Sequence, residues 1–412
     1  MGTAFNTALS ALNANTTAID IVGNNLANLN TTGFKDSTVD FSDIMAEQLG
    51  AGSSSQVGLG VGQVQSVQDF SQGSVTNTGS ALDAAIQGNG FFVVNDSDNN
   101  QLYTRDGSFQ LNSSGDLVTA TGQSVQGWMA TDGVVNPNGA TSNITVPIGS
   151  TIAPSATANM SMSVNLDSST AVNGTYSTPI QVYDSLGQAH TLTVTYTETA
   201  AGSWSYNVTI PAADLTAGGT TTVATGTLTF GPNGQLTSPA AGAPINIAIA
   251  GLADGANNMS INWNVYNSAG TTADITQYAQ ASSMSNPQQD GFAAGQISNV
   301  SIQNGGLVVA NYSNGQQVTV GQLAVANIAN PTSLEQVGDN NLQATAATAQ
   351  AAIGASGTGG NGTIEGESLE ASNTNMATEF TQLLTYERAY QAASRVITTS
   401  DQLAQETVNL IH

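Results

Sequence analysis

The chain has no cysteine among its 412 residues and only four basic side chains, Lys35, Arg105, Arg388 and Arg395. The missing thiols exclude disulfides, thiolate metal sites and cysteine nucleophiles. With 28 acidic residues the net charge is −24. Because nucleic acids and anionic lipids are both held by Lys and Arg, the composition excludes nucleic-acid binding and electrostatic attachment to a membrane.

Long apolar runs are also missing. No stretch approaches the roughly 18–20 apolar residues of a membrane-spanning helix, so no membrane insertion is expected. A cleaved secretory signal needs basic residues before an apolar run, whereas the first basic residue here is Lys35. A nearly Lys-free polar surface without cysteine is typical of an exposed extracellular protein, so we expect export by a route without a cleaved signal peptide.

Residues with catalytic potential are scarce. The only histidines are His190 and His412, and no Gly-x-Ser-x-Gly elbow accompanies them. His190 is interpreted as a surface residue of a strand. The run Asp96-x-Asp98-x-Asn100 resembles half of a calcium loop, but Gln101 and Gly107 replace the required Gly and Glu, so a hairpin turn is favoured. We expect no catalytic residues, no cofactor and no metal site.

What the chain does have is a seven-residue apolar period at both ends, the pattern of a coiled-coil seam. A helix is predicted over residues 3–29, and a second over 365–411, with Glu365, Glu367 and Glu370 in its first turns. An ordinary amphipathic core helix is the alternative for the first segment. The predicted seam residues are also taken as subunit-interface residues, except for Ala404, which only continues the repeat: Phe5, Leu12, Ile19, Leu26, Leu369, Met376, Leu383, Tyr390, Ile397 and Ile411.

Between the ends, short runs of β-forming residues alternate with Asp-Gly, Asn-Gly and Ser-Gly turns. A short helix is expected through Phe41, Ile44, Met45 and Leu49. The Gly/Ser-rich stretch 50–63 reads as a flexible connector, and 346–363 as a linker. The stretch 151–279 holds no Lys or Arg and reads as a separate sandwich or barrel.

The predicted fold class is α+β, mainly β, with terminal α-helices that form a coiled-coil-like inner domain and two β-rich domains nested between them. The inner domain with its connector takes residues 1–72 and 363–412. A discontinuous β-rich core domain takes 73–150 and 280–362. The inserted outer domain takes 151–279.

The segment NNLANLNTTGFK resembles the N-terminal signature of the bacterial flagellar rod and hook proteins. GNGFFVV (88–94) with YTRDGSF (103–109) resembles the β core of that family, and LEASNTNMATEFTQLLTYERAYQAASRVITTSDQ (369–402) resembles its C-terminal helix. The insertion at 151–279 is similar to the outer domain of hook proteins, and its length favours hook over rod. The family-motif residues are Asn24, Asn25, Asn28, Gly33, Phe34 and Lys35.

The resemblance implies a structural role without catalysis. A hook subunit polymerises into a bendable tube, the universal joint that carries motor torque from rod to filament. Its partners are further copies of itself, the distal rod, the hook cap, the hook–filament junction proteins and the flagellar type III export apparatus. The implied location is the extracellular flagellum. A distal rod or junction protein and, in another class, a secreted β-rich adhesin or hydrolase are the alternatives.

Overall fold

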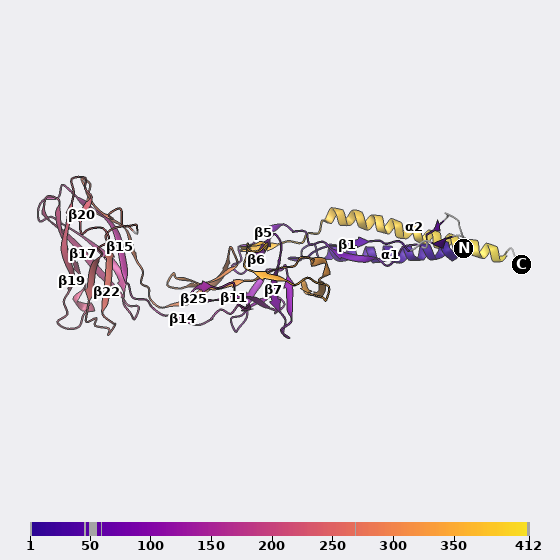
Figure 1. Ribbon diagram of the computed structural model, residues 1–412, viewed down its shortest axis with the longest axis horizontal. Coiled ribbons are helices and arrows are strands. Elements are labelled where there is room, and N and C mark those ends of the chain that lie inside the picture. The colour runs from indigo at the N-terminus through magenta and orange to yellow at the C-terminus, as the bar shows by residue number, and fades with distance from the viewer. Residues whose placement is uncertain (1, 45–46, 49–55, 59, 268, 410–412) are drawn as a thin grey trace. The chain divides into compact units, whose positions relative to one another are not determined.

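The computed structural model describes residues 2–44, 47–48, 56–58, 60–267 and 269–409. The chain divides into two compact units. Unit 1 comprises Met1–Ile148, Asn299–Asn311 and Gln317–His412, and unit 2 comprises Gly149–Ser298 and Tyr312–Gln316. The predicted fold class is confirmed: most of the regular secondary structure is β-strand, with one long α-helix towards each end of the chain (Figure 1).

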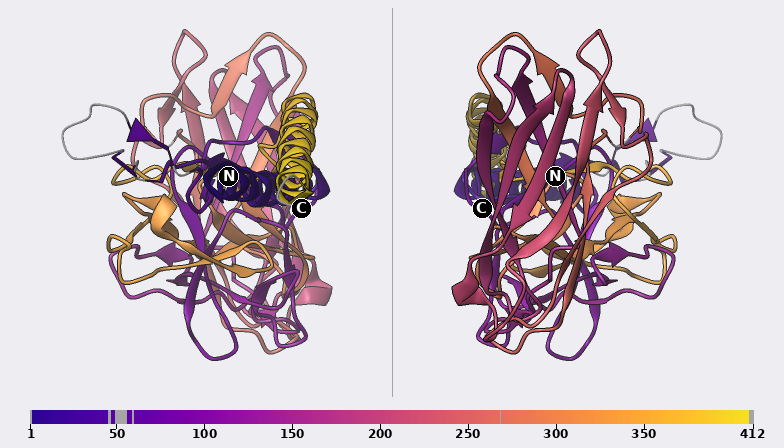
Figure 2. Two further views of the ribbon diagram at one scale, coloured as in Figure 1. Left: turned by 90° about the vertical axis from the view of Figure 1, so that its right-hand side faces the viewer. Right: turned by 90° about the vertical axis from the view of Figure 1, so that its left-hand side faces the viewer.

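The two helices of unit 1 are α1 (Gly2–Ala27) and α2 (Met376–Asn409). They lie side by side and run in opposite directions (Figure 1, Figure 2). The predicted helix over 3–29 matches α1 within two residues at each end. Neither helix, within the described residues, has the length and apolar character needed to cross a membrane.

The predicted start of the C-terminal helix at residue 365 is wrong. Residues 363–370 form strands β32 (Thr363–Gly366) and β33 (Ser368–Glu370), and Glu367 between them has φ of 54°, outside the helical region. The helix begins after Asn375, whose Oδ1 accepts hydrogen bonds from the backbone N–H groups of Ala377 and Thr378 at 3.0 and 3.3 Å. That is an N-cap, so the three glutamates never belong to the helix.

The strands of unit 1 form one large sheet and four two-stranded pairs among the described residues. The pairs are antiparallel: β1 (Ser37–Asp40) with β4 (Gln65–Gln68), β2 (Glu47–Gln48) with β3 (Gln56–Val57), β6 (Ala84–Gln87) with β32, and β5 (Val75–Asn77) with β33. The chain segment before α2 therefore pairs with strands from the first quarter of the sequence, and this fixes both helices to the same β scaffold.

The large sheet has the order β26-β27-β11-β7-β8-β30-β29, with shorter strands pairing at its sides. Its members in the first part of the chain are β7 (Phe91–Asn95), β8 (Gln101–Thr104), β9 (Phe109–Leu111), β10 (Leu117–Thr119), β11 (Ser124–Thr131), β12 (Val134–Val135) and β13 (Ser142–Asn143). Those of the later part are β26 (Leu307–Tyr312), β27 (Gln317–Leu323), β28 (Val325–Asn327), β29 (Glu335–Gly338), β30 (Asn341–Gln343) and β31 (Ala352–Gly354), with the short 3₁₀ helix η2 (Pro331–Ser333) after β28. Phe91, Val93 and Trp128 are at the centre of a buried cluster on this sheet.

Two of the segments predicted as a short helix and as a linker in unit 1 contain β structure instead. The short helix expected near Phe41 and Ile44 is wrong, because strand β1 precedes these residues and Asp43 forms a β-bridge with Val61; Met45 and Leu49 lie outside the described residues. Half of the connector at 50–63 lies outside them too, while residues 56–57 form β3. The predicted linker 346–363 contains β31, which pairs with β28.

Unit 2 is a sandwich of two sheets. One has the order β21-β22-β15-β23 with β24 also on β15, and the other has the order β16-β17-β18-β19-β20. The strands of this unit are β14 (Thr151–Ile152), β15 (Asn159–Asp167), β16 (Thr175–Tyr183), β17 (Ala189–Ala200), β18 (Ser203–Thr209), β19 (Thr222–Phe230), β20 (Leu236–Ser238), β21 (Ile245–Ile249), β22 (Met259–Asn264), β23 (Ile275–Tyr278) and β24 (Ser283–Gln289), with the 3₁₀ helix η1 (Ala212–Asp214) after β18 and β25 (Gly295–Gln303) leaving the unit.

The two sheets of unit 2 share one core. Side chains alternate between buried and exposed along β15, β16 and β17, as expected for strands with one face covered. Trp204 and Trp263 are completely buried among aliphatic side chains from both sheets, and the Tyr206 ring meets the Trp263 ring edge to face with centroids 5.5 Å apart. The core therefore depends on apolar packing, as its lack of Lys and Arg requires.

The prediction that His190 is a surface residue is wrong. Its side chain is 4% exposed, and its ring nitrogens lie 3.0 Å from carboxylate oxygens of Asp184 and Asp214. These acids come from two different connecting segments, so sequence spacing around His190 gave no indication of the cluster.

Candidate assembly interface

The helix pair of unit 1 buries mostly small and apolar side chains, with one polar pair, Asn25 and Glu379. The buried residues of α1 recur on one face, and α2 contributes few large buried residues. Small side chains let two helices approach closely. The buried helix residues are Ala8, Ala14, Ala18, Val22 and Asn25 on α1, and Glu379 and Ala393 on α2.

The predicted seam residues lie mostly beside this buried face. Phe5 is 40% exposed, and Leu12, Ile19 and Leu26 are half-buried. On α2, Leu383 and Ile397 are half-buried, Met376 and Tyr390 are exposed, and Ala404 is exposed as well. Leu369 is in strand β33 instead of a helix, and Ile411 lies outside the described residues.

Of the apolar residues that are exposed most on α2, sequence reasoning named Met376 but missed Phe380, Leu384, Val396 and Leu403. Met376, Phe380 and Leu384 follow at intervals of four, so they share one side of the helix, and they are 50%, 50% and 55% exposed. Val396 and Leu403 are exposed on another side, at 45% and 57%. A period of four beside the period of seven was the signal that could have identified them. A helix that leaves apolar side chains on two sides uncovered has surface for further partners.

The motif Asn24–Lys35 forms the base of the helix pair. Asn25 connects three elements: its Nδ2 donates to Ser37 O at 2.9 Å and to Glu379 Oε2 at 3.1 Å, and its Oδ1 accepts from Ser37 N at 3.0 Å. Asn28 instead donates locally to Asn24 O at 2.9 Å, in the last turn of α1. One asparagine therefore joins α1 to β1 and α2, while the other two finish the helix.

Gly33 is the point where the motif meets the β scaffold. It has φ of 68°, and a Cβ there would lie 2.6 Å from the Arg105 carbonyl carbon. Its N–H donates to Glu370 O at 2.8 Å. Both the backbone conformation and the close approach require glycine. Phe34 next to it is buried.

Two of the four basic side chains in the sequence converge on one buried acid. Lys35 Nζ lies 2.6 Å from Glu370 Oε1, and Arg105 Nη1 lies 3.0 Å from Glu370 Oε2. All three side chains are at most 6% exposed. We call these three residues the anchor triad. It ties the segment between α1 and β1, which contains Lys35, to β33 and to the residue that follows β8.

Backbone groups supply further hydrogen bonds to the triad, although the buried Arg105 Nε has no partner among the described residues. Lys35 Nζ also donates to Ser71 O at 2.6 Å, Arg105 Nη2 donates to Gly88 O at 2.8 Å, and Glu370 Oε1 accepts from Gly73 N at 2.8 Å. Burial lowers the pKa of Lys35 and of Arg105, although contact with Glu370 opposes that shift. Sequence analysis assigned Glu370 to a helix dipole and did not connect it with either cation.

The calcium-like run is a hairpin turn between β7 and β8. Asp96 Oδ1 accepts from the backbone N–H of Asp98 at 2.9 Å and of Asn100 at 2.8 Å, and Asn100 Nδ2 donates to Oδ2 at 2.9 Å. The carboxylate is occupied by its own turn, and these hydrogen bonds lower the pKa of Asp96. The hairpin turn therefore accounts for the Asp and Asn side chains at positions 96 and 100.

Models of known protein families match the N-terminal motif, the β-rich regions and the C-terminal helix of this chain. Family models match at residues 5–35 (flagella basal body rod protein), 85–167 (flagellar hook protein FlgE/F/G D1 domain), 155–292 (flagellar basal body protein FlaE D2 domain) and 365–410 (flagellar basal body rod FlgEFG protein C-terminal). Together they cover most of the terminal helices, the motif Asn24–Lys35 and the sandwich.

Whole-chain relatives are hook proteins. The chain is 35% identical to the flagellar hook protein FlgE of Salmonella typhimurium over 98% of this chain and 99% of the relative. It is 34% identical to the Escherichia coli K12 protein of the same name over 99% and 100%. The Borreliella burgdorferi hook protein is 31% identical over 98% of both chains. The chain belongs to the flagellar hook protein family.

Proposed function

We propose that this chain is the repeating subunit of a bendable tubular hook that transmits torque from the rod to the filament, and that the helix pair supplies its subunit contacts. As a hook family member it is a structural protein of the flagellum and not an enzyme. The single observation that carries the interface assignment is the uncovered apolar surface of α2, where Met376, Phe380 and Leu384 are at least half exposed.

The physical argument for assembly is the cost of that surface. Fully burying one large apolar side chain contributes about 1.5–3 kcal/mol, and each subunit of a tube would repeat the gain. The contact surface we propose includes the exposed row of α2 together with Phe5, Leu12, Ile19 and Leu26 of α1 and Leu383, Tyr390 and Ile397 of α2. Of the four basic residues only Arg388 and Arg395 are exposed, so contacts between copies depend on apolar packing more than on ion pairs.

The finer partners follow from the family role. We propose that the ends of the polymer meet the distal rod, the hook cap and the hook–filament junction proteins, and that the subunit leaves the cell through the flagellar type III apparatus without cleavage of its N-terminus. The intact mass of subunits from purified hooks tests the last point. Loss of N-terminal residues beyond the initiator methionine would contradict it.

Electron microscopy of the concentrated, purified chain tests the main proposal. Curved tubes are expected above a critical concentration, and subunits should return to solution on dilution. A secreted adhesin predicts instead a monomer at all concentrations that binds glycans. A folded protein that stays monomeric and retains no glycan on an array would exclude both functions.

A further inference from the structure

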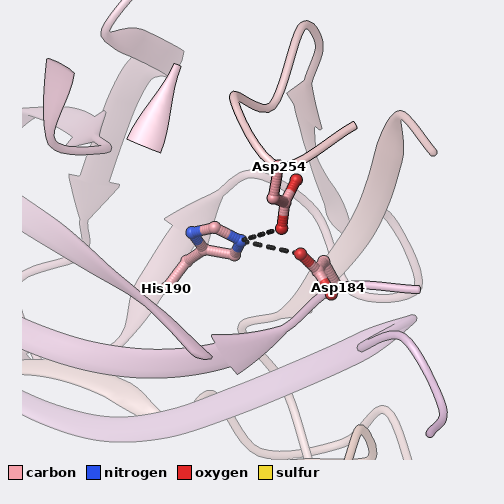
Figure 3. A group of neighbouring side chains, drawn as sticks. All are labelled: Asp184, His190 and Asp254. Carbon is pink, nitrogen blue, oxygen red and sulfur yellow. Dashed lines mark hydrogen bonds and ion pairs between the residues drawn. The ribbon is translucent and has the colours of Figure 1, made fainter. Parts of the chain in front are cut away.

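A buried histidine in unit 2 is surrounded by three aspartates from separate segments. His190 is the second residue of β17, Asp184 lies in the turn between β16 and β17, Asp214 ends η1, and Asp254 lies in the loop between β21 and β22. His190 and Asp184 are 4% and 0% exposed, and Asp214 and Asp254 are each 28% exposed. Figure 3 shows Asp184 and Asp254 converging on one ring nitrogen.

In Asp184 and Asp254, one carboxylate oxygen accepts hydrogen bonds from the backbone of its own turn and the other oxygen faces His190. Asp184 Oδ1 accepts from the backbone N–H of Leu186 at 2.8 Å and of Gln188 at 2.9 Å, which leaves Oδ2 at 3.0 Å from His190 Nε2. Asp254 Oδ1 accepts from Ala256 N at 3.0 Å, which leaves Oδ2 at 4.0 Å from the same nitrogen. Each turn therefore fixes the second oxygen of its carboxylate near Nε2, where the Asp184 and Asp254 carboxylates also interact with each other.

The other ring nitrogen has its own acceptor. His190 Nδ1 lies 3.0 Å from Asp214 Oδ2, and the backbone supports that position because Ala253 N donates to Asp214 O at 2.9 Å. An Nδ1–H donated to a carboxylate directs the lone pair of a neutral imidazole to Nε2. Histidines that bind metals usually have this arrangement, with the second ring nitrogen donating to a carboxylate or carbonyl.

In the neutral imidazole, the Nε2 lone pair faces the oxygens of two negatively charged carboxylates. These groups repel one another unless a positive charge lies between them. The sequence of unit 2 contains no Lys or Arg to supply one. A proton on Nε2 satisfies Asp184 but leaves Asp254 beyond hydrogen-bond distance at 4.0 Å. A divalent cation between the three atoms would neutralise both carboxylates.

The spacing fits such a cation. The candidate ligand atoms of Asp184, His190 and Asp254 all lie within 4.8 Å of one another, with separations from Nε2 of 3.0 and 4.0 Å. Tetrahedral zinc bonds to nitrogen and oxygen of about 2.0–2.2 Å place neighbouring ligand atoms about 3.3–3.6 Å apart. Closing the wider separation needs a shift of less than about 1 Å in the partly exposed Asp254. Imidazole with carboxylates suits zinc and nearby transition metals better than calcium or magnesium.

We propose that Asp184 Oδ2, His190 Nε2 and Asp254 Oδ2 form a binding site for Zn²⁺ or a similar divalent transition metal, oriented by Asp214. Solvent would complete the coordination on the side of the exposed Asp254. The ion would join the β16–β17 turn, which belongs to one sheet, to the β21–β22 loop of the other, and would so clamp one end of the sandwich.

Zinc titration of the chelator-stripped full chain by calorimetry tests the proposal at pH 7. His412→Asn is included in every variant, because His412 is the only other histidine. One zinc per chain is expected. Asp254→Asn should weaken binding at least tenfold, since it removes a ligand charge but keeps the Oδ1 acceptor of the turn. Asp214→Asn should weaken it about 10–100-fold by releasing the ring.

Asp167→Asn is the matched control. Asp167 Oδ1 accepts from the backbone N–H two residues later, at 2.9 Å from Ser169 N, as Asp254 Oδ1 does, but it lies outside the cluster. The zinc affinity of Asp167→Asn should equal that of the parent. Nitrogen NMR of His190 gives a second readout: zinc should convert the ring to the form with a proton only on Nδ1. No zinc binding, equal binding by Asp254→Asn, or a His190 ring that stays doubly protonated with zinc present would overturn the proposal.

Discussion

At the scale of residues, the anchor triad shows what a scarcity of positive charge does to a fold. Two of four cations are buried on Glu370, although burying an ion costs several kcal/mol before its partner offsets the loss. Such a cluster contributes little net stability over apolar packing, but it tolerates only one arrangement of its segments. It therefore fixes how the segment between α1 and β1 meets β33 and the end of β8.

Removing the shared acid should be strongly destabilising. Glu370→Ala leaves Lys35 and Arg105 buried without a counter-charge, which costs about 3–5 kcal/mol, or roughly 6–20 °C in the melting temperature of unit 1. Differential scanning calorimetry measures it. Glu335→Ala, on exposed strand β29, is the control and should stay within about 0.5 kcal/mol of the parent. Equal melting of the two variants would show that the triad is not structural.

Glu379 should make the helix pair sensitive to pH. Burial raises its pKa, and the nearby Asp36 raises it further, although the hydrogen bond from Asn25 opposes both. A carboxyl with a raised pKa in the fold binds protons more tightly there than in the unfolded chain. Its favourable contribution is therefore complete below the ordinary pKa near 4.5 and is lost as pH rises through the raised value.

Glu379→Gln should accordingly melt at a higher temperature than the parent at pH 7, with the difference vanishing near pH 4. Gln keeps an acceptor for Asn25 and removes the charge. Calorimetric scans between pH 4 and 8 measure this. Glu387→Gln, exposed on the same helix, serves as control. A parent whose melting is no more pH-dependent than Glu379→Gln over that range would refute the assignment.

At the scale of elements, periodicity predicted where helices exist better than where they end. The seven-residue repeat identified α1 and all of α2, because a helix keeps its apolar period whichever partner covers that face. It extended α2 too far, since Leu369 continues the repeat by chance while Asn375 caps the helix. Likewise no local pattern connects Glu370 with Arg105, or His190 with Asp214 and Asp254, because these pairs form only when distant strands come together.

The exposed row of α2 should be needed for assembly and not for folding. Leu384→Asp places a charge at a position whose side chain is 55% exposed in the single chain. The free energy of unfolding of the variant should therefore differ from that of the parent by less than about 0.5 kcal/mol. Burying that charge between copies would cost several kcal/mol per subunit and stop polymerisation. Thr385→Asp adds the same charge to the neighbouring exposed position.

Sedimentation and microscopy at matched concentration compare the two variants. Loss of tubes in Leu384→Asp alone supports a contact through the Met376, Phe380 and Leu384 side. Normal tubes in both would move the contact to the Val396 and Leu403 side, and loss in both would point to net charge as the cause.

At the scale of the whole molecule, the chain enters and leaves the sandwich at one place. Ser155 and Phe292 pair through two backbone hydrogen bonds of 3.0 and 2.9 Å, and β14 pairs with the start of β25, with Ile152 opposite Gly295. A deletion ending at residue 279, the predicted boundary, would leave β24 without its partner β15. Removal of 153–294 with a short Gly-Ser bridge from Ile152 to Gly295 is the cleaner cut.

This deletion should leave a protein that still polymerises but forms tubes of altered shape. The helices, the anchor triad and the large sheet of unit 1 remain, so the contacts proposed for assembly are intact. Because unit 2 has no Lys or Arg, its contacts with other copies would be polar and apolar, and salt should affect the curvature they impose only weakly. Electron microscopy of the deleted chain at low and moderate salt measures this. Straight tubes of near-normal packing are expected, whereas a folded unit 1 that never assembles would assign the essential contacts to the sandwich.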